Sequence, residues 1–310
     1  MMKILIAYDG SDASRTPIED LGRAGLPRHV QAVVLAVADV WLPPETTEGD
    51  VPLRAPVVER AIAKAAEVLS ATKRVSEEGA GAVRRLFPQW SVAAEAVADS
   101  PAWALIKRAT GLEADLIVIG SHGYSPITNL LFGSVSLKVV AEADCSIRVG
   151  RKGRHGDGPV RILVGIDGSV DADAAITAIA QRDWPKGSEV RLLTAIDNNI
   201  ETAAAALGPA FAGWVRADDD DATGWVTRML DDAAARLQMR GLIVSTGLVE
   251  GDPKYSLLNE AESWGADTVF VGARGHSLFE RLLLGSVSSA VAVRAHCSVE
   301  IVRTRGAHTQ

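Results

Sequence analysis

The chain has 310 residues, of which 47% are hydrophobic, and a formal net charge of −7. This composition allows one large core or two ordinary ones, and an acidic balance with no basic stripe argues against nucleic acid as a partner. The sequence has no apolar run near the ~20 residues of a membrane helix and no secretory signal pattern at its start. Its two cysteines are too few for a disulfide framework. We therefore expect a soluble, cytoplasmic protein without a membrane partner.

The first half of the chain alternates short apolar runs with amphipathic segments. The run Ile4–Tyr8 is typical of a strand buried in a parallel sheet, and the Ser-Asp-Ala-Ser that follows offers an N-cap for a helix from about Ser14. Further strands are expected over Val33–Val37, Trp90–Val97, Ala114–Gly120 and Cys145–Gly150, and helices over Arg54–Glu77, from Pro101 onward and over Ser134–Ala141. This alternation predicts a doubly wound, mostly parallel sheet of five strands.

The second half repeats the first. "KILIAYDGS" from Lys3 returns as "RILVGIDGS" from Arg161, an offset of 158 residues. Later matches, at an offset of 152 residues, are Pro101 with Pro253, Asp115 with Asp267 and Cys145 with Cys297. The extra residues of the first copy are expected in its proline-rich stretch "WLPPETTEGDVPLRAP", since surface loops tolerate insertion.

A polar, glycine-rich stretch, "GRKGRHGDGP", separates the two copies and is typical of a linker. We predict two tandem Rossmann-like α/β domains, over residues 1–150 and 160–310, joined by residues 151–159. The second set of strands is expected over Ile162–Ile166, Val190–Ile196, Ile243–Val249, Thr268–Val271 and Ser298–Val302. Sheets of this kind bind ligands at the carboxyl ends of their strands.

The most specific repeated motif follows the fourth strand of each copy. "GSHGYSPITNLLFGSVS" from Gly120 returns as "GARGHSLFERLLLGSVS" from Gly272. Glycine at these positions permits close approach of a ligand to the backbone, or a positive φ. The motif residues are Gly120, Gly123, Gly133, Ser134, Val135 and Ser136 in one copy, and Gly272, Gly275, Gly285, Ser286, Val287 and Ser288 in the other. The last four of each set begin a predicted helix, whose free N–H groups and two hydroxyls suit a phosphate. The nine residues between the second and third glycines would form a flap around it.

Asp9 and Asp167 end the first strand of each copy, where they could reach a sugar hydroxyl or a base. A purely structural interpretation of these residues stays open. Glycines at strand ends and Gly-Ser before a helix are common turn and cap devices, and duplication copies a scaffold as faithfully as a site.

The pattern Gly-x2-Gly-x9-Gly-Ser, after a strand that reads Ala-Asp-x-Ile/Val-x-x-Gly, resembles the universal stress protein family, as does the opening Asp-Gly-Ser strand. The resemblance covers essentially the whole chain apart from linker and termini. In that family the motif marks the members that bind ATP, with Mg as a possible companion. It implies adenine near Asp9 and Val37 in the first copy and near Asp167 and Ala195 in the second. Ribose and phosphates would lie at the glycines and serines listed above, with Ile119 and Val271 beside the base or ribose.

Two departures from the pattern distinguish the copies. Ala195 replaces a more usual valine and shrinks the apolar contact with the base. Arg274 lies between two motif glycines, where the first copy has His122. An arginine pairs with a phosphate at any physiological pH, whereas histidine is mostly neutral near pH 7. The second site is therefore expected to be the tighter one, unless both residues are solvated loop positions.

The sequence shows no dedicated catalytic group. It contains no P-loop, and no Gly-x-Gly-x-x-Gly follows a first strand. Fast phosphoryl transfer needs a positioned base and charge stabilisation, so we expect a nucleotide-responsive binding protein in the stress response, with slow ATP hydrolysis at most and no catalytic metal. The alternatives are a nucleotide-free scaffold and an adenine-nucleotide-dependent transferase or hydrolase of the wider fold group.

The resemblance also implies how the halves assemble. Domains of that family pair through their last strands, here "CSIRVGR" and "CSVEIVR", which would form an internal pseudo-dimer. Arg148 and Glu300 interrupt these apolar strands and either modulate the pairing or face solvent. A homodimer of the whole chain and the identity of a protein partner are left open.

Overall fold

The computed structural model describes residues 1–40, 56–121, 132–153, 158–196, 219–275 and 284–304, with side chains in α2 from residue 60 and in α8 from residue 224. The first half contains β1 (Met2–Ala7), α1 (Asp12–Asp20), a 3-10 turn η1 (Leu21–Arg23), β2 (Val30–Ala38), α2 (Pro56–Leu86), β3 (Ser91–Ala98), α3 (Pro101–Leu112), β4 (Leu116–Gly120), α4 (Ser134–Glu142) and β5 (Ser146–Gly150). The second half contains β6 (Arg161–Gly165), α5 (Val170–Ala180), β7 (Glu189–Ile196), α8 (Asp219–Gln238), β8 (Ile243–Glu250), α9 (Pro253–Trp264), β9 (Thr268–Gly272), α10 (Ser286–Arg294) and β10 (Ser298–Val302).

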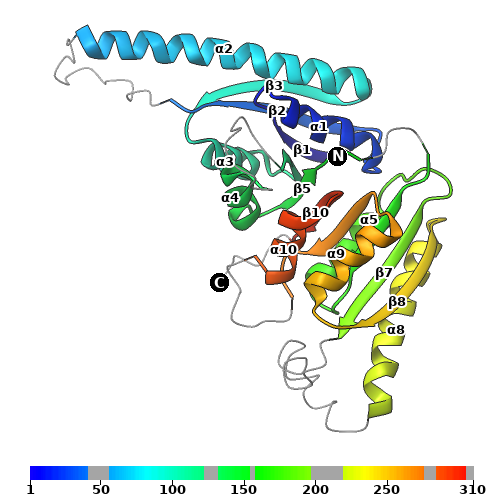
Figure 1. Cartoon of the computed structure of the whole chain (residues 1–310). Helices are drawn as coiled ribbons and strands as arrows, with labels where there is room; N and C mark the ends of the chain where they lie inside the picture. Colours follow the sequence, from blue (N-terminus) through cyan, green and yellow to red (C-terminus); the bar gives the residue numbers. More distant parts are fainter. Residues whose placement is uncertain (41–55, 122–131, 154–157, 197–218, 276–283, 305–310) are drawn as a thin grey trace.

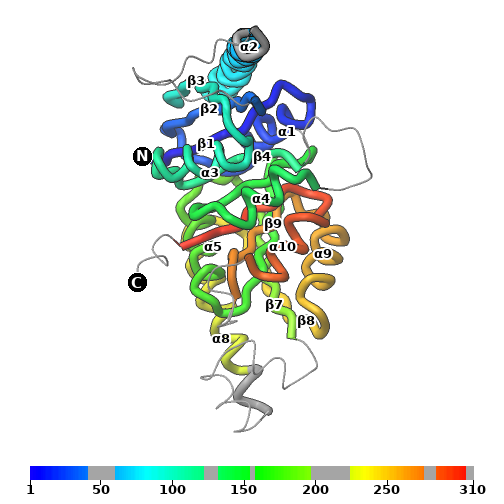
Figure 2. Tube along the Cα trace, turned by 90° about the vertical axis from the view of Figure 1, so that its left-hand side faces the viewer, coloured from blue at the N-terminus to red at the C-terminus, as the bar shows by residue number. Residues whose placement is uncertain are grey.

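The strands form one continuous sheet of ten strands in the order β3-β2-β1-β4-β5-β10-β9-β6-β7-β8. Each half contributes five parallel strands, so the predicted α/β fold class is confirmed. The two halves meet where β5 and β10 pair antiparallel, with Arg148 opposite Glu300. We call this contact the seam. In Figure 2 the two halves lie end to end, with α2 at one end of the molecule and α8 at the other.

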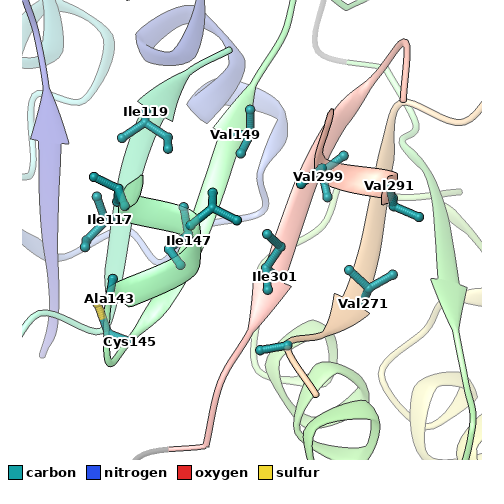
Figure 3. Close-up of a cluster of buried hydrophobic side chains, with 14 of the residues drawn as sticks. Ile117, Ile119, Ala143, Cys145, Ile147, Val149, Val271, Val291, Val299 and Ile301 are labelled. Atoms are coloured by element: carbon teal, nitrogen blue, oxygen red, sulfur yellow. The ribbon is translucent and has the colours of Figure 1, made fainter. Parts of the chain in front are cut away.

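Helices cover both faces of the sheet, but the two faces are built differently (Figure 1). On one face α3, α4, α9 and α10 pack on a single apolar core that runs through both halves. On the other face α1 and α2 cover a core of the first half, and α5 and α8 cover a separate core of the second half. The seam is therefore apolar on one face only. Figure 3 shows Ile147 and Val149 on one side of it and Val299 and Ile301 on the other.

The opposite face of the seam holds charged side chains. Arg148 and Glu300 are each 1% exposed and form an ion pair with 3.2 Å between Nη1 and Oε2. The alternative in which Arg148 and Glu300 face solvent is therefore wrong. Because side chains alternate between the two faces of a strand, a single register of β5 and β10 separates apolar from ionic contacts.

Two equivalent arginines reach across the seam. Arg151, just after β5, donates to carbonyl oxygens of Ala292 and Val293 in the last turn of α10. Arg303, just after β10, donates to those of Val140, at 2.6 Å, and Ala141 in the last turn of α4. A cation at a helix C-terminus satisfies carbonyls that have no partner within the helix and complements the helix dipole. Each half thus caps a helix of the other.

The elements match their predicted bounds to within a few residues, except α2, which continues past Glu77 to Leu86. In this added part α2 packs closely on the sheet. A Cβ on Gly79 would lie 2.6 Å from Cδ1 of Tyr8, the residue that follows β1, so only glycine leaves room for this contact. None of the helices in the described ranges is long and apolar enough to cross a membrane.

Replacing Gly79 by alanine should destabilise the fold by about 1–3 kcal/mol, because the new methyl group overlaps the Tyr8 ring. Gly81→Ala is the matched control in the same helix, since the nearest atom to its Cβ is the flexible end of Arg85 at 3.6 Å. It should stabilise by up to about 1 kcal/mol through helix propensity. Urea unfolding measures both; equal effects of the two changes would contradict the proposed contact.

Candidate functional site

The motif loops lie where the strand order reverses. In the first half β1 pairs with β2 on one side and with β4 on the other, and β6 is placed in the same way between β7 and β9. The connections after β1 and β4 therefore leave neighbouring strand ends in opposite directions, which is where sheets of this kind place their ligands. We call the region between these two strand ends the crevice. Asp9 and Gly120 lie at these two ends in the first half, and Asp167 and Gly272 in the second.

Each motif loop is closed by the same backbone hydrogen bond. The N–H of Gly133 donates to the carbonyl of Ser121 at 2.8 Å, and that of Gly285 donates to the carbonyl of Ala273 at 2.8 Å. The third glycine is thus tied to the residue that follows the first. Gly123, His122 and the nine-residue stretches expected to form flaps lie wholly or mostly outside the described residues.

The helices after these loops begin without a capping side chain. Gly133 and Gly285 are the N-cap residues of α4 and α10, both with extended backbone, and neither helix has a side-chain cap. By contrast, Ser11 and Ser169 cap α1 and α5 with their hydroxyls. Among the residues that the structure describes, no side chain caps the first N–H groups of α4 and α10, which suit an anion.

The motif serines divide into two roles. Ser136 and Ser288 are 7% and 2% exposed. Their hydroxyls donate within the loop, Ser136 to the carbonyl of Gly120 at 2.8 Å and Ser288 to that of Ala273 at 2.9 Å. Ser134 and Ser286 are exposed at the first helical position. Of the two hydroxyls in each half, only these are open to a ligand.

The aspartate of the first strand meets the motif in the second half. A Cβ built on Gly275 would lie 2.8 Å from Oδ2 of Asp167, whose Oδ1 accepts a hydrogen bond from the N–H of Ser169 at 2.9 Å. In the first half Oδ1 of Asp9 accepts from the N–H and hydroxyl of Ser11 at 2.9 and 2.6 Å. Glycine at 275 therefore leaves room for a carboxylate at the mouth of the crevice.

The apolar residues named for the base differ in exposure. Ile119 and Val271 are 2% and 3% exposed and belong to the core that runs through both halves, so only their backbone borders the crevice. Val37 and Ala195 are half-buried at the ends of β2 and β7. Val135 and Val287, also half-buried, pack against that core in the first turns of α4 and α10.

Arg274 has a partner within the protein. Its Nε and its backbone N–H donate to Oδ2 of Asp171 at 3.0 and 3.2 Å. Asp171 is 3% exposed, and its Oδ1 accepts from the N–H and hydroxyl of Thr304 at 3.2 and 2.8 Å. Arg274 thus already forms an ion pair within the protein, through its Nε; the ranking of the second site as the tighter one stays a prediction. Asp171 went unnoticed in the sequence, although its counterpart, Ala13, marks a difference between the copies.

Gly272 has a structural task as well. A Cβ there would lie 2.8 Å from the backbone nitrogen of Ala172 and 2.9 Å from the carbonyl carbon of Asp171. The end of β9 therefore touches the N-terminus of α5, which leaves no space for a side chain. For this glycine the close approach is made by a helix of the protein itself.

The described residues include neither a reactive thiol at Cys297 nor a cluster of metal ligands. Burial raises the pKa of the Cys297 thiol to about 12, which keeps it protonated and a poor nucleophile. Within the described ranges, no group of three or more His, Cys, Asp or Glu side chains gathers in a way that could hold a metal ion.

Asp171→Asn should destabilise the protein by about 2–3 kcal/mol, because the amide NH2 faces hydrogen-bond donors and leaves Arg274 without its counter-charge. Asp173→Asn is the matched control, with the same change in the same helix turn. Its exposed ion pair with Arg236 should be worth less than about 1 kcal/mol. Chemical denaturation distinguishes them, and an equal loss in both variants would contradict the role of Asp171 in holding Arg274 and Thr304.

Comparison with known proteins identifies the repeated unit. A model of the universal stress protein family matches residues 1–150 and 160–303. Universal stress protein Rv2005c of Mycobacterium tuberculosis is 28% identical over 248 residues, which span 76% of this chain and 76% of that protein.

Solved structures show the same fold. The structure of a universal stress protein from Archaeoglobus fulgidus DSM 4304 is similar with a TM-score of 0.66 at 20% identity and covers 98% of both chains. A structure from Pseudomonas aeruginosa UCBPP-PA14 gives a TM-score of 0.55 at 13% identity, over 98% of this chain and 93% of that one. Because the family model matches both halves, the chain belongs to the universal stress protein family, as a tandem member with two copies of the family's domain.

Proposed function

We propose that each half binds ATP at the crevice between its first and fourth strands, and that the protein acts as a nucleotide-responsive regulator. The observation that carries this proposal is the closed glycine loop in front of an uncapped helix, present in both halves with the same 2.8 Å hydrogen bond. Such a helix start offers N–H groups and a partial positive charge to a phosphate.

The residues present fit the parts of the nucleotide. Ser134 and Ser286, with the first N–H groups of α4 and α10, would hold phosphate oxygens. Asp9 and Asp167 would accept hydrogen bonds from the sugar or base, and the half-buried Val37 and Ala195 would contact the base. A magnesium ion would come with the phosphates, since Mg²⁺ is usually held by phosphate oxygens, water and one or two carboxylates.

The described groups favour binding over fast chemistry. Each crevice offers one aspartate, which already accepts a hydrogen bond from its own turn, and Arg274 is paired with Asp171. A phosphoryl-transfer enzyme needs a base or water-positioning group and cations that neutralise developing charge. We infer that occupancy by ATP, rather than turnover, is the state that a protein partner detects.

A nucleotide-free scaffold is the second candidate. It is favoured by the packing of Gly272 against α5 and by the hydrogen bonds of Ser136 and Ser288 within the loops. Under this alternative the motif residues serve the fold alone, and their replacement changes stability without any change in ligand binding.

Gly275→Ala separates the two candidates. The new methyl group displaces the Asp167 carboxylate but lies on an exposed residue, so the free energy of unfolding should change by less than about 0.5 kcal/mol. We expect the wild-type protein to release adenine nucleotide from both halves on denaturation, or to bind ATP in both on titration. The variant should keep only the site of the first half.

Gly158→Ala is the control, because a Cβ at this linker glycine meets open space; it should leave both sites intact. If the wild-type protein neither carries nor binds nucleotide, the scaffold is correct. If Gly275→Ala keeps both sites, the nucleotide lies elsewhere.

ATP hydrolysis should be far slower than the ~10 s⁻¹ typical of enzymes. Single-turnover release of phosphate from bound ATP measures it, with Asp9→Asn and Asp167→Asn reporting on each half. Ordinary enzyme rates that both substitutions abolish would instead favour a transferase or hydrolase.

A further inference from the structure

The seam places equivalent positions of the two repeats opposite each other. Arg148 faces Glu300 in the antiparallel register, and these residues are 152 positions apart, which is the offset of the repeat in this region. If two first halves paired in the same way, Arg148 would face a second Arg148. If two second halves did so, Glu300 would face a second Glu300.

Many contacts at the seam would form equally well in any of these pairings. The apolar residues of β5 and β10 are alike, and Arg151 and Arg303 make equivalent contacts with α10 and α4. These contacts stabilise the seam without selecting which halves meet. Selection needs features that differ between the copies.

The first such feature is a buried network of four charges. Arg148 donates to Asp20 at 2.6 and 3.1 Å and to Glu300 at 3.2 Å, and Glu300 accepts from Arg182 at 2.9 Å. The four side chains are between 1% and 7% exposed. Each half brings its own counter-ion, Asp20 for Arg148 and Arg182 for Glu300. Pairing of like halves would keep these two ion pairs but would replace the central Arg148–Glu300 pair by two buried arginines or two buried glutamates, where screening by water is weak.

The second feature is shape. Arg182 donates to the carbonyl of Ala24 at 2.8 Å, and a Cβ on Gly25 would lie 2.7 Å from the ring of Trp184. At the offset of 158 residues, Ala24 is the counterpart of Arg182 itself. Two second halves would therefore bring a pair of arginines to a position that now holds one arginine and one alanine, and two first halves would leave a void.

We propose that this charge and size asymmetry is a specificity device: it selects pairing of the first half with the second and excludes pairing of like halves. The distinction matters for assembly. A chain whose two halves pair with each other closes on itself. A chain whose halves pair only with like halves of other chains leaves a free half at each end and grows into an open polymer.

A cysteine reporter tests the pairing. Val149→Cys and Val299→Cys, in a background of Cys145→Ala and Cys297→Ala, face each other in the observed register, at a separation compatible with a disulfide. Unlike halves of one chain give an intrachain disulfide, and unlike halves of two chains give an interchain disulfide. Like halves give an assembly without this bond, since 149 would face 147 and 299 would face 301.

The reporter protein is compared with a neutral variant that adds Asp20→Asn, Arg148→Met, Arg182→Met and Glu300→Met, and with the same variant plus Trp184→Leu. Each is unfolded, refolded over a range of concentrations, oxidised, and analysed by light scattering and non-reducing electrophoresis. We expect a monomer with the intrachain bond from the reporter protein at every concentration. In the neutral variant, the fraction of dimers and longer assemblies that lack this disulfide should be several-fold larger and should rise with protein concentration. Adding Trp184→Leu should raise this fraction further.

The control Arg148→Lys with Glu300→Asp keeps the charges and should behave as the reporter protein does. If the neutral variant does not fold, as judged by circular dichroism, a polar version with Asp20→Asn, Arg148→Gln, Arg182→Gln and Glu300→Gln replaces it with the same expected result, because it leaves no buried charge without its partner. Monomers with the intrachain bond from both neutral variants and from Trp184→Leu would overturn the proposal. Dimers with interchain bonds would also overturn it, because they retain the pairing of unlike halves.

Discussion

The antiparallel contact between β5 and β10 is the constraint on which the rest of the molecule depends. It turns two five-stranded sheets into one and merges the apolar cores of α3, α4, α9 and α10 into a single core. On the other face, four buried charges must be taken out of water, which ion pairing only partly offsets. The apolar face therefore supplies most of the stabilisation of the seam, and the ionic face determines which strands meet.

The seam also reaches the two crevices. Arg151 and Arg303 contact the last turns of α10 and α4, the helices whose first turns face the crevices. In the second half Thr304, two residues after β10, donates to Asp171, which also accepts from Arg274 in the motif loop. Loss of the seam would thus remove C-terminal caps from both site helices. The geometry of each site depends on the presence of the other half.

The sequence was sufficient for the fold of each half, because apolar runs, turn residues and the repeat offset report local structure and its duplication. The glycine spacing also placed Gly133 and Gly285 at the start of a helix, which is where the structure has them. The partner of Arg274 was beyond this reasoning, since Asp171 lies 103 residues earlier and is brought near only by the packing of α5 against β9. Burial of Arg148 was equally hidden, because a lone arginine in a strand is compatible with an exposed edge until the neighbouring strand is known.

Fusion of two domains in one chain removes a restriction that a homodimer cannot escape. A residue that lies on a twofold axis faces a copy of itself, so a buried charge there meets its like, and a bulky side chain there meets another of the same size. In this chain the two copies differ in sequence, and Glu300 faces Arg148 while Arg182 and Trp184 face Ala24 and Gly25. The same freedom applies at the crevices, where Asp171 in one copy corresponds to Ala13 in the other. A seam that no longer has to be symmetric permits two sites that no longer have to be identical.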